Sequence, residues 1–87
     1  IKSRLRGAFP NPFNGSTSIQ YEIAETQDVE IAIYSLQGAK VKSWEVKQTP
    51  PGIYSHNWFA NDLSSGIYLL VFKAGSFVEK EKIILIK

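Results

Sequence analysis

Short segments of this chain alternate between apolar and polar side chains, and this alternation restricts the fold more than any other feature. Residues 18–23 follow the two-residue period of a strand with one buried face, and residues 29–34 repeat it after a turn at residues 26–28. No segment of useful length follows the 3.6-residue period of an amphipathic helix. The pattern therefore predicts an all-β chain.

Turn-forming residues divide the rest of the chain into similar segments. Pro50, Pro51 and Gly52 interrupt it, because prolines do not fit a central strand and glycine readily adopts turn conformations. The expected strands cover residues 18–23, 29–34, 40–48, 53–59, 67–73 and 77–87. Residues 67–73 are almost wholly apolar, which predicts a central strand covered, or nearly so, on both faces. Six or seven strands at this spacing predict an antiparallel β-sandwich.

Length and composition predict one domain. The chain has 87 residues, of which 44% are hydrophobic, and this content suffices for one core. Because it opens on Ile1 rather than methionine, we expect a piece of a longer polypeptide. In this interpretation residues 1–8 form a linker from an upstream domain and residues 9–87 form a single module. The absence of cysteine excludes disulfides, cysteine-ligated zinc and thiol nucleophiles.

The charge pattern argues against two classes of partner. The formal net charge is +2, and Lys2, Arg4 and Arg6 form the only basic cluster. A nucleic-acid binder usually carries a stronger and more focused patch, so no nucleic-acid partner is expected. The longest apolar run, residues 83–86, is far shorter than the ~20 residues that cross a bilayer, so no transmembrane segment is expected.

The titratable residues do not predict an enzyme. His56 is the only histidine, so a Ser-His-Asp triad would depend on it alone, and its strand position predicts a core or rim residue. Asp62 could bind calcium with loop carbonyls, but a lone acid is more typical of a turn. Glu79 and Glu81 are expected to face solvent beside lysines. We therefore assign no catalytic residue, metal or cofactor.

Aromatic side chains leave a second function open. Tyr54, Trp58, Phe59 and Tyr68 would stack on sugar rings if they formed a flat exposed face, although aromatics at strand spacing more often belong to a core. Exposure of Phe59 and Trp44 would support such a surface. The alternative hypothesis is therefore a carbohydrate-binding or structural accessory module of a secreted surface hydrolase.

The segment Phe-Pro-Asn-Pro-Phe-Asn-Gly at residues 9–15 predicts a stiff turn in front of the strands. Each proline fixes its own φ near about −65° and drives the residue before it towards extended geometry. The asparagine side chains can bond nearby backbone amides, and the two Phe rings can pin the turn onto a core. A shaped loop is expected rather than a spacer.

This turn and several later segments resemble, in order and spacing, the C-terminal sorting domain of the type IX (Por) secretion system. The resemblance covers residues 9–87. The matching segments are residues 9–14, 16–23, 29–34, 38–41, 51–52, 63–68 and 80–87, the last of which reads Lys-Glu-Lys-Ile-Ile-Leu-Ile-Lys. Each segment alone is weak evidence, but the ordered set is specific.

The resemblance implies an immunoglobulin-like sandwich at the end of an exported protein, without a catalytic site of its own. It assigns the recognition of the sorting signal to Pro10, Asn11 and Pro12 in the first motif, Gly66 and Tyr68 in the second, and Lys82, Ile84 and Lys87 in the last. The basic terminal strand would then offer an edge that pairs with a receptor strand.

We therefore interpret the chain as a non-enzymatic sorting and anchoring module. The implied partners are the type IX translocon, a sortase-like peptidase and the cargo domain upstream in the same polypeptide. The implied location is the exterior or the outer-membrane surface of a Gram-negative bacterium, reached through the periplasm. The residues leave open which cargo precedes the domain, whether the domain is cleaved, whether it dimerises, and whether it binds sugar or calcium.

Overall fold

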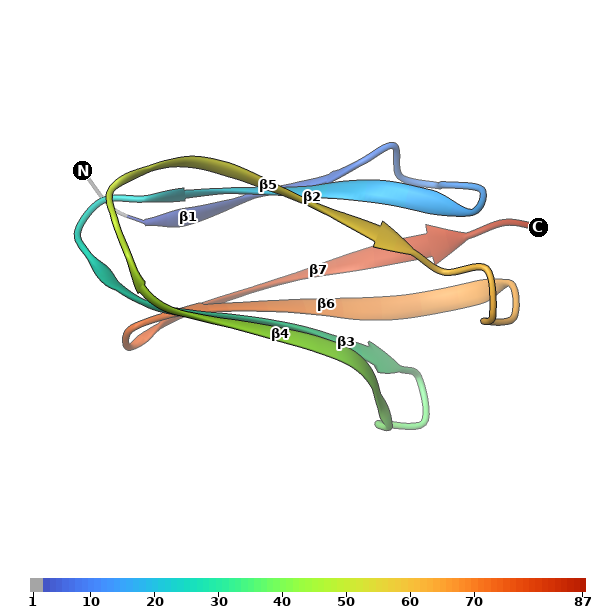
Figure 1. The fold of residues 1–87 in the computed structure, drawn as a ribbon. Coiled ribbons are helices and arrows are strands. Elements are labelled where there is room, and N and C mark those ends of the chain that lie inside the picture. The colour runs from blue at the N-terminus through green and yellow to red at the C-terminus, as the bar shows by residue number, and fades with distance from the viewer. Residues whose placement is uncertain (1–2) are drawn as a thin grey trace.

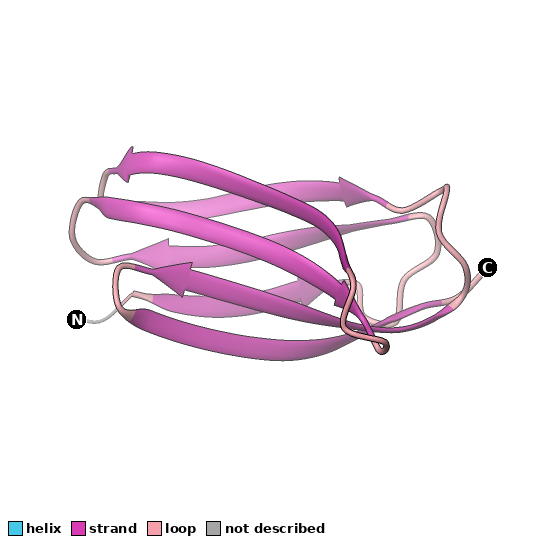
Figure 2. Cartoon of the chain, turned by 90° about the horizontal axis from the view of Figure 1, so that it is seen from below, coloured by secondary structure: helices cyan, strands magenta, loops and turns pink. Residues whose placement is uncertain are grey.

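The computed structural model describes residues 3–87 as two antiparallel β-sheets packed face to face (Figure 1). The strands are β1 (Arg4–Phe9), β2 (Ser16–Ile23), β3 (Gln27–Ser35), β4 (Lys40–Thr49), β5 (Gly52–Phe59), β6 (Gly66–Ala74) and β7 (Phe77–Leu85). One sheet has the order β1-β2-β5 and the other the order β4-β3-β6-β7. Short loops join the strands (Figure 2), and no helix able to cross a membrane occurs within residues 3–87. The predicted all-β sandwich is confirmed.

Strand β1 corrects the expected linker. The sequence predicts a linker over residues 1–8, whereas Arg4–Phe9 form a strand that pairs with β2. The first two residues lie outside the described part of the chain. A bulge between Leu5 and Gly7 shifts the register of β1, so Leu5 and Ala8 are both buried although they differ in parity. This shift breaks the two-residue alternation by which a strand is recognised.

The core lies between the sheets and consists of the side chains that the alternation directs inward. Burying one such aliphatic or aromatic side chain stabilises the fold by about 1.5–3 kcal/mol. The largest fully buried side chains are Phe72, Ile19, Ile31, Ile33, Leu70, Ile83, Leu85, Val29 and Thr49. They come from both sheets, so each sheet covers the apolar face of the other.

Strand β6 is central in its sheet, as predicted, because it lies between β3 and β7. Its two faces differ more than the sequence suggests. Leu70 and Phe72 point into the core and are fully buried, whereas on the other face Ile67 and Lys73 are exposed, Leu69 is half-buried and Val71 is buried. The outer face of this strand is therefore covered only in part.

Replacing Phe72 tests how far the domain depends on this single core. Phe72 is 0% exposed, and we expect Phe72→Ala to lower the free energy of unfolding by about 3–5 kcal/mol, or to unfold the domain, because a large cavity forms. Urea denaturation followed by tryptophan fluorescence measures the change. Leu36→Ala is the control, since Leu36 is 69% exposed. Equal midpoints for the two variants would contradict the prediction.

Candidate functional site

Asn11 joins the proline-rich turn to the last strand. Its Nδ2 donates to the backbone carbonyl of Lys82 at 3.0 Å, and its Oδ1 accepts from the backbone N–H of Ile84 at 3.0 Å. A backbone residue of a neighbouring strand would offer β7 the same donor and acceptor. One side-chain amide thus substitutes for the strand that this edge of β7 lacks.

Phe13 extends this pairing through its backbone. Its N–H donates to the carbonyl of Ile84 at 2.9 Å, and its carbonyl accepts from the N–H of Ile86 at 2.8 Å, which makes a parallel bridge to Leu85. The Phe13 ring is 2% exposed and lies 5.4 Å from the ring of Trp58. The turn is therefore held on β7 by side-chain and backbone hydrogen bonds and by one buried ring.

The two prolines present the outer surface of this turn. Pro10 and Pro12 are exposed, and each follows a cis peptide bond. The Thr17 hydroxyl donates to the carbonyl of Pro10 at 2.7 Å, and the Gly15 carbonyl accepts from the N–H of Ala60 at 2.7 Å. The turn is thus tied to β2 and to the end of β5 as well as to β7.

The second predicted motif pairs with the same end of β7. Gly66 lies opposite Leu85, and Tyr68 lies opposite Ile83 in the β6–β7 ladder. The Tyr68 ring is buried, and its hydroxyl donates to the carbonyl of Ser64 at 2.6 Å. Tyr68 therefore shapes the loop that precedes β6 from inside the core.

That loop also holds Lys87. The backbone N–H of Lys87 donates to Ser65 Oγ at 3.0 Å, and its Nζ donates to the carbonyl of Asn61 at 2.6 Å. Through these contacts the structure brings the eight predicted signal residues, which come from three separate segments, to the same end of β7. The side chain of Lys82 is exposed and that of Ile84 is half-buried, both on the outer face of the sheet.

The expectation of a free terminal edge is wrong for residues 82–86. The outward-pointing backbone groups of Lys82, Ile84 and Ile86 are bonded to Asn11 and Phe13. A receptor strand could pair here only after it displaced the turn. Sequence reasoning missed this contact because an asparagine in a turn gives no sign of a bond to a strand so far along the chain.

Glu79 and Glu81 correct a second expectation, because both face β1 rather than solvent. Glu79 Oε1 accepts from the N–H of Leu5 at 2.8 Å, and Glu81 Oε2 accepts from the N–H of Ala8 at 3.1 Å. The carboxylates satisfy donors on the free edge of β1 and link the two sheets. Glu79 and Glu81 occupy the same alternating positions as the buried residues at the end of β7. This two-residue period is the signal that could have predicted that both side chains face inward.

Gly7 makes this contact possible. Its φ of 122° is rarely adopted by residues with a side chain, and a Cβ atom at this position would lie 2.9 Å from Glu81 Oε1. The bulge of β1 and the approach of the Glu81 carboxylate therefore depend on the same residue.

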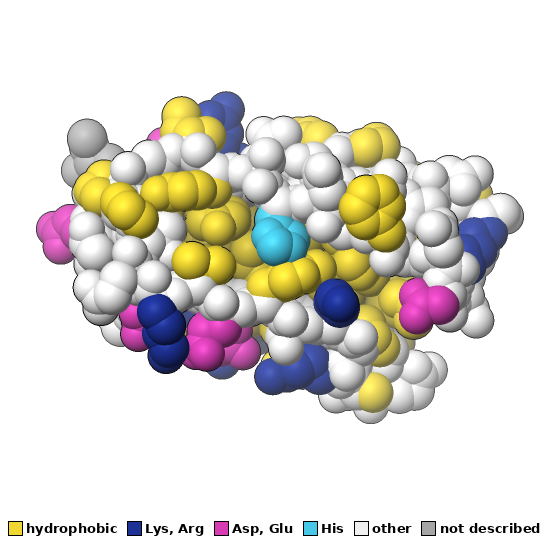
Figure 3. All heavy atoms as spheres, in the orientation of Figure 1, with side chains coloured by type: hydrophobic (Ala, Val, Ile, Leu, Met, Phe, Trp, Pro, Cys, Tyr) yellow, Lys and Arg dark blue, Asp and Glu magenta, His cyan; other side chains and the backbone are white. Residues whose placement is uncertain are grey.

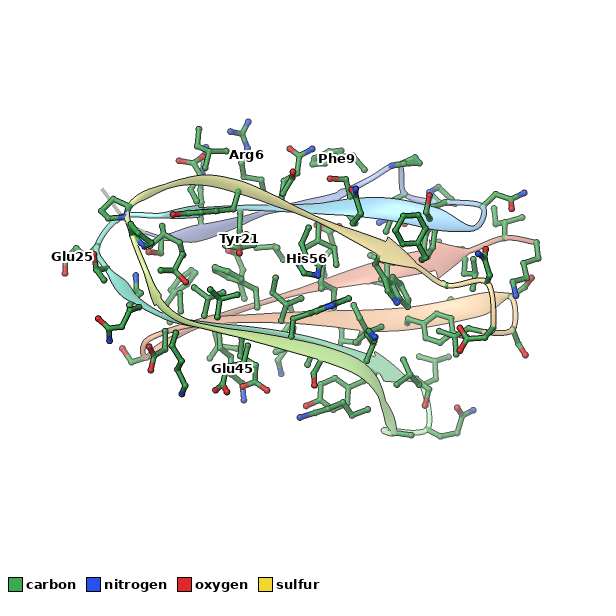
Figure 4. All side chains as sticks on the ribbon, viewed as in Figure 1. Arg6, Phe9, Tyr21, Glu25, Glu45 and His56 are labelled. Atoms are coloured by element: carbon green, nitrogen blue, oxygen red, sulfur yellow. The ribbon has the colours of Figure 1, made fainter. Side chains whose placement is uncertain are left out.

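His56 is half-buried at the opposite side of the sandwich, as its strand position predicts. Its ring centroid lies 4.4 Å from that of Trp44, edge to face, between β5 and β4. Figure 4 shows His56 and Tyr21 pointing between the sheets, while Arg6 and Phe9 point away from the core. Figure 3 shows the histidine set among hydrophobic side chains. Its surroundings are those of a packed ring.

No cluster of three or more potential metal ligands occurs within residues 3–87. The four aromatics considered for sugar stacking do not share an exposed face. Trp58 and Tyr68 are 3% and 8% exposed, Tyr54 is half-buried against Tyr21, and Phe59 alone is strongly exposed, at 66%. These four residues therefore do not form the flat exposed face that stacking on sugar rings would require, and the buried Trp58 and Tyr68 fit the expectation that such aromatics belong to the core.

The chain matches a protein-family model over most of its length. The family model described as a secretion system C-terminal sorting domain matches residues 7–87, a range that begins within β1 and contains all three predicted signal segments. No curated protein matches the chain.

Removing the Asn11 amide tests the link between the turn and β7. We expect Asn11→Ala to lower the free energy of unfolding by about 1–2 kcal/mol and to accelerate hydrogen exchange at the Ile84 amide, because two hydrogen bonds are lost. Native-state exchange followed by NMR measures both effects. Asn14→Ala is the matched control, since Asn14 is exposed and outside these bonds. Unchanged exchange at Ile84 would refute the link.

The pKa of His56 tests its packing. Partial burial of the ring lowers this pKa below 6.5, and the positive charge of Lys42 lowers it further. The unfolded chain therefore binds the proton more readily, so the stability supplied by neutral His56 is complete above about pH 6.5 and declines as the pH falls towards the folded-state pKa. Lys42→Gln should raise the pKa in an NMR titration. A value at or above 6.5 in the unmodified domain would contradict this account.

Proposed function

The chain belongs to the C-terminal sorting domains of type IX secretion, and we propose that the export machinery recognises it as a folded surface rather than as a linear sequence. The surface consists of the turn at residues 10–13 and the end of β7 at residues 82–87. We call it the turn–β7 surface. The domain acts in this role by being bound and catalyses no reaction.

The hydrogen bonds of Asn11 to the backbone of Lys82 and Ile84 carry this proposal. They hold the turn that carries two exposed prolines against the backbone of the strand that carries the exposed Lys82 side chain. A rigid ligand surface loses little conformational entropy on binding, so a receptor gains affinity from such preorganisation. The turn and the strand therefore form one recognition element, although about seventy residues separate them.

The proposed partners follow from this role. The translocon of the outer membrane binds the turn–β7 surface on the periplasmic side and carries the attached cargo to the cell exterior. A sortase-like peptidase then separates the domain from its cargo, which stays on the cell surface or is released. The cargo is the domain that precedes residue 1 in the complete polypeptide.

A secretion assay tests the proposed function. We expect a periplasmic reporter enzyme fused in front of residues 1–87 to be exported by a bacterium with type IX machinery, and deletion of residues 82–87 to leave it in the periplasm. Asn11→Ala should reduce export several-fold without changing any side chain of β7, because the turn is no longer fixed on the strand. Reporter activity in the culture medium and in the periplasm measures the distribution.

Asn14→Ala in the same fusion is the control and should be exported normally. Protease resistance of the periplasmic fusion shows whether each variant has folded. Export that survives the deletion of residues 82–87 would overturn the proposed function. Full export of a folded Asn11→Ala fusion would show that the export machinery recognises β7 without the turn fixed on it.

A further inference from the structure

The outer face of the four-stranded sheet contains a groove that the turn–β7 surface does not explain. It has a volume of about 590 Å³ and runs along β6 between β3 and β7. Figure 2 views the molecule from the side of this sheet. Residues of its lining are Tyr34, Leu36, Ile67, Leu69, Val71 and Val78, together with three lysines, Lys73, Lys80 and Lys82.

The strand register explains how this groove is built. On β6, Leu69 and Val71 form the apolar floor, and β7 places Lys82 opposite Leu69 and Lys80 opposite Val71. On the other side, β3 places Tyr34 opposite Leu69. The groove therefore has an apolar floor, an aromatic wall and a basic wall.

The lysines of the basic wall are available for a partner. Lys80 and Lys82 are exposed, and neither takes part in the ion pairs found among residues 3–87. No acidic side chain lines the groove. Val71 is already buried and Leu69 is half-buried, so the favourable apolar contacts with a partner would come from Leu69 and from the exposed Ile67 and Val78. A positive wall selects a partner that also carries negative charge.

We propose that this groove binds an extended, acidic and apolar segment of a protein of the export machinery. The identity of the partner rests on the function proposed above, whereas the chemistry of the segment follows from the groove alone. Residues 67–73 of β6 span about 20 Å at ~3.3 Å per residue, which is the length of a segment of about seven extended residues. Its apolar side chains contact β6 and its carboxylates meet Lys80 and Lys82.

Two other occupants fit the surface less well. An anionic membrane lying flat on this sheet would also meet Glu30, which lies opposite Lys73, and Glu45, which points away from the core in Figure 4. A second copy that used the same face would bring the lysines of the two copies together at a cost of like-charge repulsion. A narrow segment that follows β6 approaches Glu30 only at its Lys73 end, does not reach Glu45 on β4, and brings no second set of lysines.

A peptide titration of the isolated domain followed by NMR tests the groove. The probe is a peptide of about eight residues that alternates valine and glutamate. We expect shift changes at the amides of Leu69, Val71, Lys80 and Lys82, and weaker binding as salt is raised. A peptide that alternates valine and lysine should not bind. Changes confined to other strands would overturn the proposal.

Two double variants that change the net charge by the same amount show whether peptide binding depends on the position of the lysines or only on the net charge. Lys80→Glu with Lys82→Glu should weaken binding of the acidic peptide by about tenfold or more, whereas Lys42→Glu with Lys47→Glu should bind almost as well as the unmodified domain. Both control lysines are exposed on β4 and outside the groove. Equal weakening in the two variants would overturn the proposal. Thermal denaturation confirms that each variant is folded.

Two further measurements assign the partner. Flotation with vesicles of phosphatidylcholine and phosphatidylglycerol should leave the domain unbound. Vesicle binding that is lost in the variant with Lys80→Glu and Lys82→Glu would instead identify an anionic membrane as the ligand of the groove. In the reporter fusion, Lys80→Glu, which changes the groove but lies outside the turn–β7 surface, should reduce export relative to Lys42→Glu on β4. Equal export would exclude the export machinery as the partner. If the unmodified fusion is not exported, the proposed function is refuted. The peptide titration alone then tests whether the groove binds an acidic segment.

Discussion

The last strand of this domain depends on the N-terminal segment for hydrogen bonds that no neighbouring strand supplies. Asn11 and Phe13 bond the backbone at the end of β7, and the side chains of Glu79 and Glu81 bond the backbone of β1. Unpaired backbone groups on a strand edge invite pairing with other chains, so a small sandwich gains both stability and solubility when they are satisfied internally. The remaining features of the surface follow from this arrangement.

Different kinds of contact join the two sheets at the two sides of the sandwich. On the β1/β7 side, carboxylates and an amide bridge the sheets through hydrogen bonds to the backbone. On the β4/β5 side, the rings of Trp44 and His56 fill the gap, and the strands are joined directly by a turn that contains two prolines. Only the first side links the beginning of the described chain to its end, through partners 71 to 74 positions apart.

Strand β7 serves both the core and the surface because its side chains alternate. Ile83 and Leu85 are buried, whereas Lys80 and Lys82 point to the outer face beside β6. Residues that stabilise the fold and residues offered to a partner therefore occupy the same strand without competing. Because the contacts of Asn11 exist only in the folded domain, the turn–β7 surface forms only when the sandwich is complete.

The sorting-domain motifs were identified by their resemblance to a known family. Local pattern was sufficient to predict the all-β class and the positions of six strands, because two-residue alternation and turn residues act over short distances. It failed at β1, where the bulge at Leu5 and Gly7 breaks the alternation. It also could not place Asn11 on β7, since a hydrogen bond between distant segments leaves no periodic trace in the turn. The parity of Glu79 indicates an inward-facing side chain, but it does not identify β1 as the partner. The amino-acid sequence alone determined the strands and their buried faces, whereas the packing of the two sheets decided which edges, carboxylates and lysines remain free.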